Sequence, residues 1–244
     1  MQTMFLYDDI TATAYYLTRV FKKRVDGSNQ YPFIRVNRTK PQTIASNEGW
    51  LLVANGGLGI SAQQPIDGIA IENGVIINNS PASGHAGAVP ITIDQNGNFG
   101  KASPSATAED VLAQGINFAI CGFCPIIEDY QDVDLTTYES MMDITEHAQR
   151  QIWGQFENGD YAILTCDGRS FNNSVGWTLT EAQTICKKHN IKFAFNMDGG
   201  GSTATVIGNK RINPLYDSGE TVERTIPSFL VFNGTDRYFV PNQQ

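Results

Sequence analysis

The sequence predicts a single domain of the α+β class (mixed α/β), in which a mixed, strand-rich sheet carries hairpins and a few packed helices. Short apolar runs recur along the chain and stop at Asn-Gly or Gly-Gly pairs, as strands that end in tight turns do. Two segments begin with the N-cap signature of a helix. The chain has 244 residues, of which 41% are hydrophobic and 17% charged. This composition supplies one sizeable core and favours one domain over two.

The first 45 residues give the weakest signals. Residues 14–20 predict a strand, and we interpret the basic run at residues 21–24 as a solvated turn rather than a binding patch. We expect residues 1–45 to form an N-terminal extension packed on a domain that spans residues 46–240. Residues 50–54 predict a strand that ends in a tight glycine loop.

Three hairpins and two more strands are expected further along. Asn-Gly pairs favour the positive φ angles of two-residue turns. The three turns are predicted at Asn73-Gly74, Asn96-Gly97 and Gly208-Asn209. Thr107 is the predicted N-cap of a short helix that ends near Gly115. Residues 116–120 and 229–232 complete the set as buried strands.

Residues 160–207 form the clearest unit. A strand at 161–166 breaks at Asp167, a helix follows, and a second strand at 191–197 breaks at Asp198. Thr178 and Glu181 form a capping box at the start of the helix. Four apolar residues fall on one helix face, namely Leu179, Ala182, Ile185 and Cys186.

A strand, a helix and a second strand joined by short loops favour a crossover with parallel strands. The carboxyl ends of such strands lie at one edge of a sheet, where ligands gather. We therefore expect Asp167 and Arg169 to meet Asp198 and its glycines there. Consecutive glycines let backbone N–H groups approach an anion, an arginine holds a phosphate bidentately, and paired carboxylates perform acid–base chemistry.

The order of these motifs resembles the phosphodiester glycosidase family over roughly residues 45–235. The most specific match is Asn196-Met-Asp198-Gly-Gly-Gly-Ser202, followed by a hairpin, Glu223-Arg224 and Ile226-Pro227. Weaker matches are Asn55-Gly56-Gly57, Arg150 with Gly154, Asp167-Gly168-Arg169, and residues 175–179. The departures are Leu58-Gly59 and Gln149, which we expect in the pocket wall, where they would change the sugar preference.

The resemblance implies a hydrolase that cuts the glycosidic bond of a sugar-1-phosphodiester or of a nucleotide-like glycosyl phosphate. The family includes an enzyme that removes N-acetylglucosamine. Asp198 is the first candidate for the catalytic acid/base or for orienting the sugar, and Asp167 is the second. The residues expected to bind the substrate or its phosphate are Asn55, Gly56, Gly57, Arg150, Arg169, Gly199, Gly200, Gly201, Ser202, Glu223 and Arg224. A salt bridge from Arg224 to Glu223 or Asp217 is the competing structural interpretation.

No cofactor is required by this chemistry, although carboxylates leave a divalent metal ion open. The three histidines, His85, His147 and His189, carry less weight, because no metal-ligand spacing links them. Cys121 and Cys124 have the spacing of a redox pair, but Pro125 and an apolar run follow where such a pair needs a helix. We expect buried free thiols.

The formal net charge of −8 argues against binding duplex nucleic acid and allows a small anionic substrate or a sugar-phosphate polymer. The sequence shows no signal peptide and no apolar run of membrane-spanning length, so we expect a soluble, cytoplasmic protein without a membrane partner. The oligomeric state stays open. Two other functions also remain: a binding module that sequesters a sugar-phosphate or nucleotide-like anion, and a structural protein of a virion or cell wall.

Overall fold

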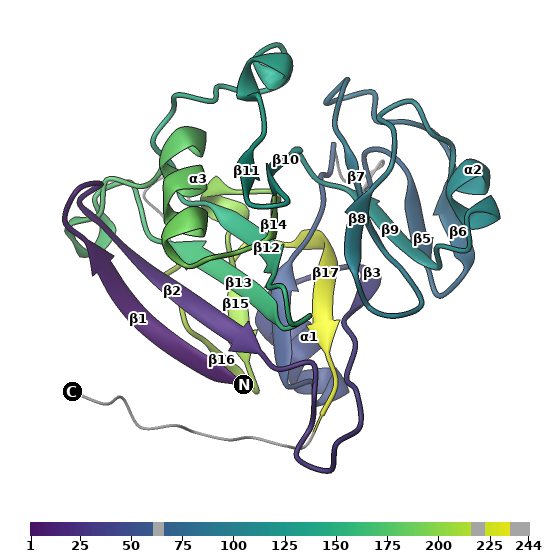
Figure 1. Cartoon of the computed structure of the whole chain (residues 1–244), viewed down its shortest axis with the longest axis horizontal. Helices are drawn as coiled ribbons and strands as arrows, with labels where there is room; N and C mark the ends of the chain where they lie inside the picture. The colour runs from purple at the N-terminus through teal and green to yellow at the C-terminus, as the bar shows by residue number, and fades with distance from the viewer. Residues whose placement is uncertain (61–65, 216–222, 235–244) are drawn as a thin grey trace.

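Three antiparallel sheets surround a common core and, with three helices, give the chain its mixed α+β fold (Figure 1). The computed structural model describes residues 1–60, 66–215 and 223–234. The seven-stranded sheet has the order β1 (Gln2–Asp8), β2 (Thr13–Val20), β13 (Tyr161–Cys166), β12 (Gln151–Gln155), β14 (Phe193–Asn196), β10 (Cys124–Glu128) and β11 (Gln131–Asp132).

Two five-stranded sheets complete the framework. The C-terminal sheet has the order β16 (Lys210–Arg211), β15 (Thr205–Ile207), β4 (Leu52–Asn55), β17 (Ile226–Phe232) and β3 (Phe33–Thr39). The lateral sheet has the order β6 (Val75–Asn78), β5 (Ala70–Glu72), β9 (Phe118–Cys121), β7 (Pro90–Ile93) and β8 (Phe99–Lys101).

Each sheet turns one face to the common core and carries a helix on the other. The core joins large side chains from all three sheets, among them Trp153, Phe195 and Leu230. The outer helices are α1 (Pro41–Glu48) on the C-terminal sheet, α2 (Ala108–Ala113) on the lateral sheet and α3 (Leu179–Lys188) on the seven-stranded sheet. Figure 1 shows α3 and α2 on opposite sides of the molecule. No helix within the described residues is long and apolar enough to cross a membrane.

The predicted local structure is confirmed at its main points. The turn between β5 and β6 has Asn73 at φ 51° and Gly74 at φ 76°, and Gly97 in the β7–β8 turn has φ 75°. Thr178 and Glu181 form the capping box of α3. The four residues of the predicted apolar face of α3 are all buried. These features depend on neighbours in sequence, which is why the sequence predicts them.

The strand–helix–strand unit has the predicted strand directions. Both β13 and β14 pair antiparallel with β12, so they are parallel to each other with β12 between them. Their carboxyl ends therefore lie at the same edge of the seven-stranded sheet, as the crossover prediction requires.

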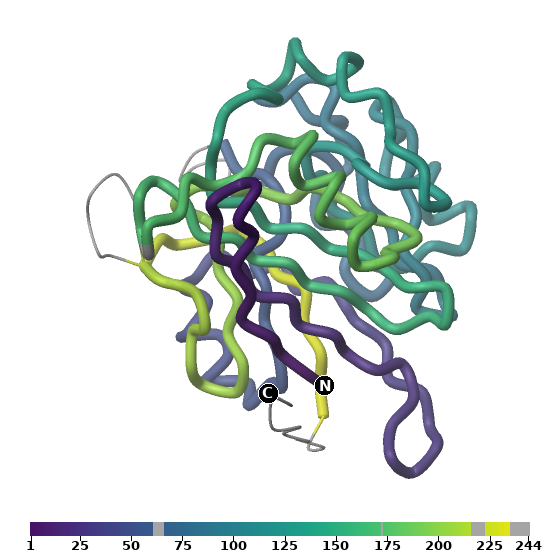
Figure 2. The backbone as a smooth tube through the Cα atoms, turned by 60° about the vertical axis from the view of Figure 1, so that its left-hand side comes forward, coloured from purple at the N-terminus to yellow at the C-terminus, as the bar shows by residue number. Residues whose placement is uncertain are grey.

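Residues 1–45, predicted as an extension packed on the domain, supply β1, β2 and β3. The first two strands form a hairpin whose second strand pairs with β13 (Figure 2). The third strand, β3, pairs with β17 near the other end of the chain. This segment thus supplies an edge strand to two sheets, β1 in the seven-stranded sheet and β3 in the C-terminal sheet.

All four cysteines are free and buried, as predicted. Cys121 ends β9 and Cys124 begins β10, so neither stands at a helix start. Burial raises the pKa of both thiols to about 12. A thiol needs a lowered pKa to act as a nucleophile, so this geometry does not fit a redox pair.

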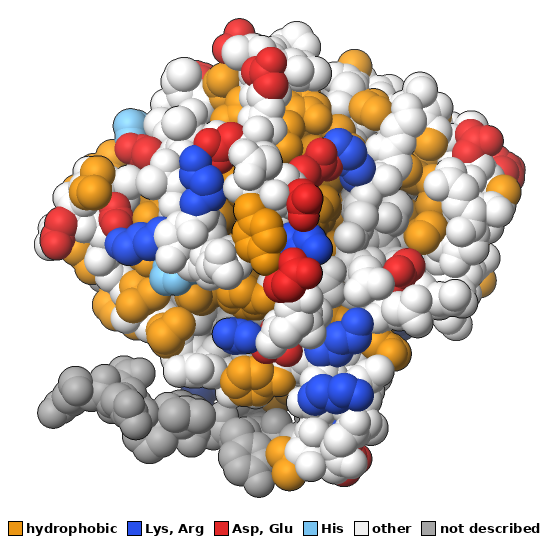
Figure 3. Space-filling model, in the orientation of Figure 1, with side chains coloured by type: hydrophobic (Ala, Val, Ile, Leu, Met, Phe, Trp, Pro, Cys, Tyr) orange, Lys and Arg blue, Asp and Glu red, His pale blue; other side chains and the backbone are white. Residues whose placement is uncertain are grey.

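Charged side chains of both signs are interspersed on the face of the molecule shown in Figure 3. Some of them pair across elements, such as Lys187 of α3 with Asp132 of β11 and Lys101 of β8 with Glu128 of β10. Exposed pairs of this kind contribute little to stability.

Candidate active site

The candidate site lies where β13 and β14 end. The amide of Cys166 donates to the Arg150 carbonyl at 3.1 Å, and the amide of Met197 donates to the Gln151 carbonyl at 2.9 Å. Asp167 and Asp198 follow the ends of β13 and β14, the two strands that flank β12. Two strand spacings separate their backbones, which corresponds to roughly 10 Å.

A pocket of about 310 Å³ opens at this edge. Loops from the seven-stranded and lateral sheets contribute acidic, basic and apolar side chains to it. The lining residues are His85, Phe123, Met141, Met142, Asp143, Glu146, Ala148, Arg150, Arg169, Asp198, Gly199 and Gly200. The volume is at the lower end of the range for small-molecule sites.

Of the two predicted carboxylates, Asp198 is the one that lines this pocket. Desolvation raises the pKa of Asp198 above the ordinary 3.8, against the opposing influence of a Ser202 hydrogen bond, the Arg224 charge and the Gly199 amide. That amide donates to Asp198 Oδ1 at 2.9 Å. A carboxyl group whose pKa is raised beside cationic groups is a candidate for proton transfer.

The glycines after Asp198 form a tight turn that ends in a 3₁₀ segment, Gly200–Ser202. The Gly200 amide donates to the Gln149 carbonyl at 2.9 Å, so this amide and that of Gly199 already have acceptors inside the protein. Gly200 has φ 56°, and a Cβ added to it would lie 3.1 Å from Arg169 Nη2. The glycines therefore let the loop pass closely under the Arg169 guanidinium.

The two pocket arginines differ in exposure. Arg150 is only 5% exposed, and its guanidinium donates to the carbonyls of Trp177 at 3.0 Å and Glu146 at 2.7 Å. Desolvation lowers the pKa of Arg150. Arg169 is exposed and adopts φ 54°, at the start of the turn after β13. One guanidinium thus lies in the pocket floor and the other at its mouth.

Asn55 holds the glycine loop instead of pointing into the pocket. Its Nδ2 donates to the Asp198 carbonyl at 2.7 Å, and its Oδ1 accepts from the Ala204 amide at 2.8 Å. Gly56 and Gly57 pass against Ser228 of β17, and a Cβ at Gly57 would lie 2.3 Å from the Cys121 carbonyl oxygen. These three residues fix the loop through backbone contacts.

Asp167, the second predicted carboxylate, is buried beneath the site and is only 1% exposed. Its amide donates to the Ala14 carbonyl at 2.9 Å. Burial raises the pKa of Tyr16 in β2, and the Asp167 charge adds to this effect. The structure therefore brings Asp167 to the predicted edge but below the pocket surface.

The two neighbouring residues Glu223 and Arg224 contact different parts of the structure. Glu223 forms an ion pair with Arg211 at 3.5 Å and accepts from the Gln42 amide, away from the pocket lining. Arg224 donates to Ser202 Oγ at 3.3 Å, and its charge acts on Asp198. The buried Ser202 thus connects Arg224 to the glycine loop. The other predicted partner of Arg224, Asp217, lies outside the described residues.

The two departures from the family pattern do not line this pocket. Leu58 packs in the core cluster of the lateral sheet, and its amide donates to the Cys121 carbonyl at 3.0 Å. Gln149 is buried, and its carbonyl receives the Gly200 amide. Their expected place in the pocket wall is therefore wrong, because the described structure uses both for packing and loop support.

His85 is one of several pocket residues that sequence reasoning did not assign to the site. Its ring Nδ1 lies 2.8 Å from Asp67 Oδ2, and the ring borders the same pocket as Asp198. The two residues are 18 positions apart on loops without motif or ligand spacing. No sequence signal connects them, since the contact arises from how the lateral sheet folds. Among the described residues, no cluster of three or more His, Cys, Asp or Glu side chains could hold a metal ion.

The three sheets and their loops thus form an α+β domain with a pocket of acidic and basic side chains at one sheet edge. The chain matches the phosphodiester glycosidase family over residues 47–233 and belongs to that family. YomE, an uncharacterized protein derived from the SPbeta prophage of Bacillus subtilis (strain 168), is 26% identical over 219 residues. The match covers 88% of this chain and 33% of YomE, so the chain spans about a third of that relative.

Solved structures share the fold at low identity. The zebrafish N-acetylglucosamine-1-phosphodiester alpha-N-acetylglucosaminidase catalytic domain, auto-inhibited by its pro-peptide, has a TM-score of 0.74 at 17% identity, covering 95% of this chain and 81% of that one. A hypothetical protein from Synechocystis has a TM-score of 0.63 at 12% identity, covering 95% of this chain and 61% of that one. These likenesses establish the architecture.

Replacing Asn55 tests its role in holding the loop. Asn55→Ala leaves the Asp198 carbonyl and the buried Ala204 amide without their partner, which should lower the free energy of unfolding by on the order of 2–4 kcal/mol. Asn29→Ala, which removes an exposed hydrogen bond to Tyr31, is the control and should change it by about 0.5 kcal/mol or less. Urea denaturation measures both. Equal small effects would contradict the structural role of Asn55.

The raised pKa of Asp198 predicts a stability change with pH. The folded-state pKa lies above the unfolded value, so folding stability is complete below the ordinary 3.8 and falls as pH rises through the folded pKa. Asp198→Asn does not ionise. It should match the wild type near pH 3 and be more stable at pH 7, as measured by thermal unfolding.

Asp26 provides a control of opposite sign. Hydrogen bonds from the Ser28 side chain and amide lower the pKa of this exposed carboxyl group. A lowered pKa contributes stability above the unfolded pKa that is lost as pH falls. Asp26→Asn should therefore be slightly less stable than the wild type at pH 7. The Asp198 assignment fails if its variant follows the same direction as Asp26→Asn.

Proposed function

We propose that this protein is a hydrolase that cleaves the glycosidic bond of a sugar-1-phosphodiester or of a nucleotide-like glycosyl phosphate. One observation carries the proposal: a single pocket combines the Asp198 carboxyl group, whose pKa is raised, with the guanidinium groups of Arg150 and Arg169. Membership of the phosphodiester glycosidase family supports it. The name of the zebrafish relative makes N-acetylglucosamine the first sugar to test.

The two arginines suit the phosphate. Arg169 at the pocket mouth presents an exposed fork of N–H donors, which matches a pair of phosphate oxygens. Arg150 adds a desolvated positive charge from the floor. Arg224 supplies a third positive charge near Asp198 through its contact with Ser202. Together they favour the charge that develops on the phosphate as its bond to the sugar breaks.

The rest of the pocket suits a sugar. Phe123, Met141 and Met142 provide apolar surface, while Asp143 and Glu146 provide acceptors for hydroxyl groups. In the reaction, water forms a bond to the anomeric carbon. The bond from that carbon to the phosphate-ester oxygen breaks, and the electron pair leaves with the phosphate ester.

Asp198 is our first candidate for proton transfer at the reacting centre. A carboxyl group whose pKa is raised by desolvation is better suited than an exposed one to carry a proton to the leaving oxygen. The buried Asp167 remains the second candidate, and its position favours supporting the turn that presents Arg169. Asn55, Gly56, Gly57 and Glu223 act by positioning, because their contacts are with the protein backbone or with Arg211.

The test is to incubate the pure protein with a panel of sugar-1-phosphodiesters and nucleotide sugars and to detect free sugar and phosphate monoester by mass. Turnover of at least one compound is expected. Binding of several compounds without any cleavage would replace the enzyme with a module that sequesters sugar phosphates.

Removing the acidic proton of Asp198 should slow the chemical step. Asp198→Asn is expected to lower kcat by roughly 10²–10⁴, the usual range for general acid–base catalysis. Substrate affinity should hold, because the amide keeps the size and most hydrogen bonds of the carboxyl group. Asp26→Asn is the matched control and should retain wild-type kcat. Full activity in Asp198→Asn would transfer the role to another group.

Replacing Arg169 should lower activity only on substrates that carry a phosphate. Arg169→Gln is expected to lower kcat/KM for a phosphodiester by about 10–100-fold, as loss of a charge-assisted hydrogen bond does. It should leave kcat/KM for an aryl glycoside of the same sugar nearly unchanged, because that substrate has no phosphate. Arg38→Gln, at an exposed arginine of β3, is the control. Equal losses on both substrates would show that Arg169 supports the sugar or the fold.

A further inference from the structure

His85 is held in the pocket by a buried carboxylate. The ring Nδ1 lies 2.8 Å from Asp67 Oδ2, and the His85 amide donates to the same oxygen at 2.7 Å. The other oxygen, Asp67 Oδ1, accepts from the amides of Ser83 at 2.9 Å and Gly84 at 3.2 Å. The Asp67 side chain is fully buried, whereas that of His85 is 32% exposed. In this arrangement Nδ1 of the imidazole faces the buried Asp67, and the opposite side of the ring, with Nε2, is left toward the pocket.

Asp67 fixes the tautomer of the ring. Burial alone would raise the pKa of Asp67, but the hydrogen bonds from Ser83, His85 and Gly84 outweigh it and lower the pKa. Asp67 is therefore a carboxylate near neutral pH. It accepts a hydrogen bond from His85 Nδ1, which keeps the ring proton on that nitrogen. In the neutral imidazole, Nε2 is then the nitrogen with a free lone pair.

The ring plane is fixed by a second contact. Phe123 meets His85 edge to face, with ring centroids 5.6 Å apart and an interplanar angle of 89°. Both rings border the pocket that contains Asp198. An imidazole that is oriented by a carboxylate, held by an aromatic ring and open at Nε2 has the geometry of a general base.

We propose that His85 is the catalytic base that activates the attacking water, with Asp67 as its positioning residue, an inference that rests on the proposed glycosyl phosphodiester hydrolysis. His85 Nε2 takes a proton from water as the water oxygen bonds to the anomeric carbon. The phosphate ester leaves with the electron pair of the broken bond and receives its proton from Asp198. His85 then returns its proton to solvent, and Asp198 regains one.

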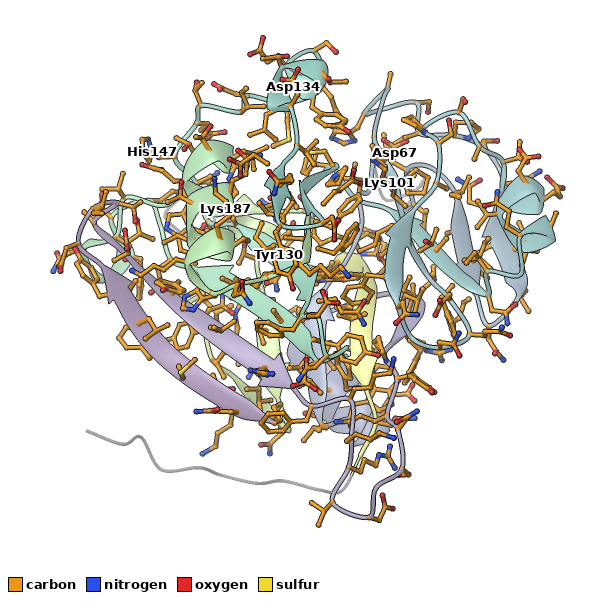
Figure 4. All side chains as sticks on the ribbon, viewed as in Figure 1. Asp67, Lys101, Tyr130, Asp134, His147 and Lys187 are labelled. Carbon is orange, nitrogen blue, oxygen red and sulfur yellow. The ribbon has the colours of Figure 1, made fainter. Side chains whose placement is uncertain are left out.

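This assignment divides the work between two groups of different character. Asp198, with its raised pKa, is suited to hold a proton, and the neutral imidazole is suited to accept one. They come from different sheets, since Asp198 follows β14 and His85 lies in the connection from β6 to β7. Figure 4 labels Asp67 near the upper end of the lateral sheet and His147 beside α3.

The deciding variant is His85→Asn, whose amide can keep the hydrogen bond to Asp67 while it lacks a group at the Nε2 position. With water as nucleophile, kcat should fall by about 10²–10⁴, and KM should change little. Sodium azide attacks carbon without losing a proton. It should restore turnover of the variant and yield the glycosyl azide, detected by mass. His85→Gln, which also lacks a basic nitrogen, is used with the same azide assay if the first variant does not fold.

His147→Asn is the matched control. His147 pairs with Glu181 at 3.2 Å and does not line the pocket. Its variant should keep wild-type kcat and show no response to azide.

Asp67 is tested through His85. Asp67→Asn should lower kcat about 10-fold or more with little change in KM, and in the His85→Asn background the same change should have almost no further effect on kcat. Such a double-mutant cycle isolates the coupling between the two residues. Additive losses would overturn the positioning role.

The outcomes separate this inference from the proposed function. Absence of turnover by the wild type across the panel overturns both. Turnover by the wild type with unchanged kcat in His85→Asn overturns only the role of His85. A folded, inactive His85→Asn variant that azide does not restore also overturns the base assignment, because the loss would then lie outside water activation.

Discussion

The side chain of Asn55 links the parts of the molecule that form the pocket. It binds the backbone on both sides of the glycine loop, at Asp198 and at Ala204. The backbone carbonyl of Asn55 accepts a hydrogen bond from the indole of Trp153 at 3.2 Å. These contacts connect the C-terminal sheet to the seven-stranded sheet at the point where the loop leaves β14. A loop of three glycines has little conformational preference of its own. The Asn55 amide therefore holds Asp198 together with the backbone bonds from Asp198 to Gly56 and from Gly200 to Gln149.

The strands at this edge explain why the site needs several sheets. β12 separates β13 from β14, so the turn carrying Arg169 and the loop carrying Asp198 approach each other over the start of β12. The lateral sheet then contributes His85, and the connection before β12 contributes Arg150. Function in this architecture resides in loops on a rigid framework of paired strands. The low identity to the zebrafish structure is compatible with this, since such loops vary while the framework persists.

Sequence reasoning succeeded where structure depends on neighbours along the chain. The capping box at Thr178, the Asn73-Gly74 turn and the parallel directions of β13 and β14 are of this kind. It placed Asp198 and Arg169 together because both follow strands of one crossover. It could not place Glu223 beside Arg211 or Asp67 beside His85, because those contacts depend on how separate segments pack in three dimensions. The family resemblance added the motif order but carried no information on this second pair.

The burial of all four thiols has a practical consequence for observing this protein in solution. Cys121, Cys124 and Cys166 are at most 1% exposed, and Cys186 is buried on the apolar face of α3. Maleimide dyes react with exposed thiolates, so the folded chain offers them no native target. A cysteine introduced on the exposed rim of the pocket would then be the sole labelling position. A fluorophore attached there would report ligand entry without removal of any native cysteine.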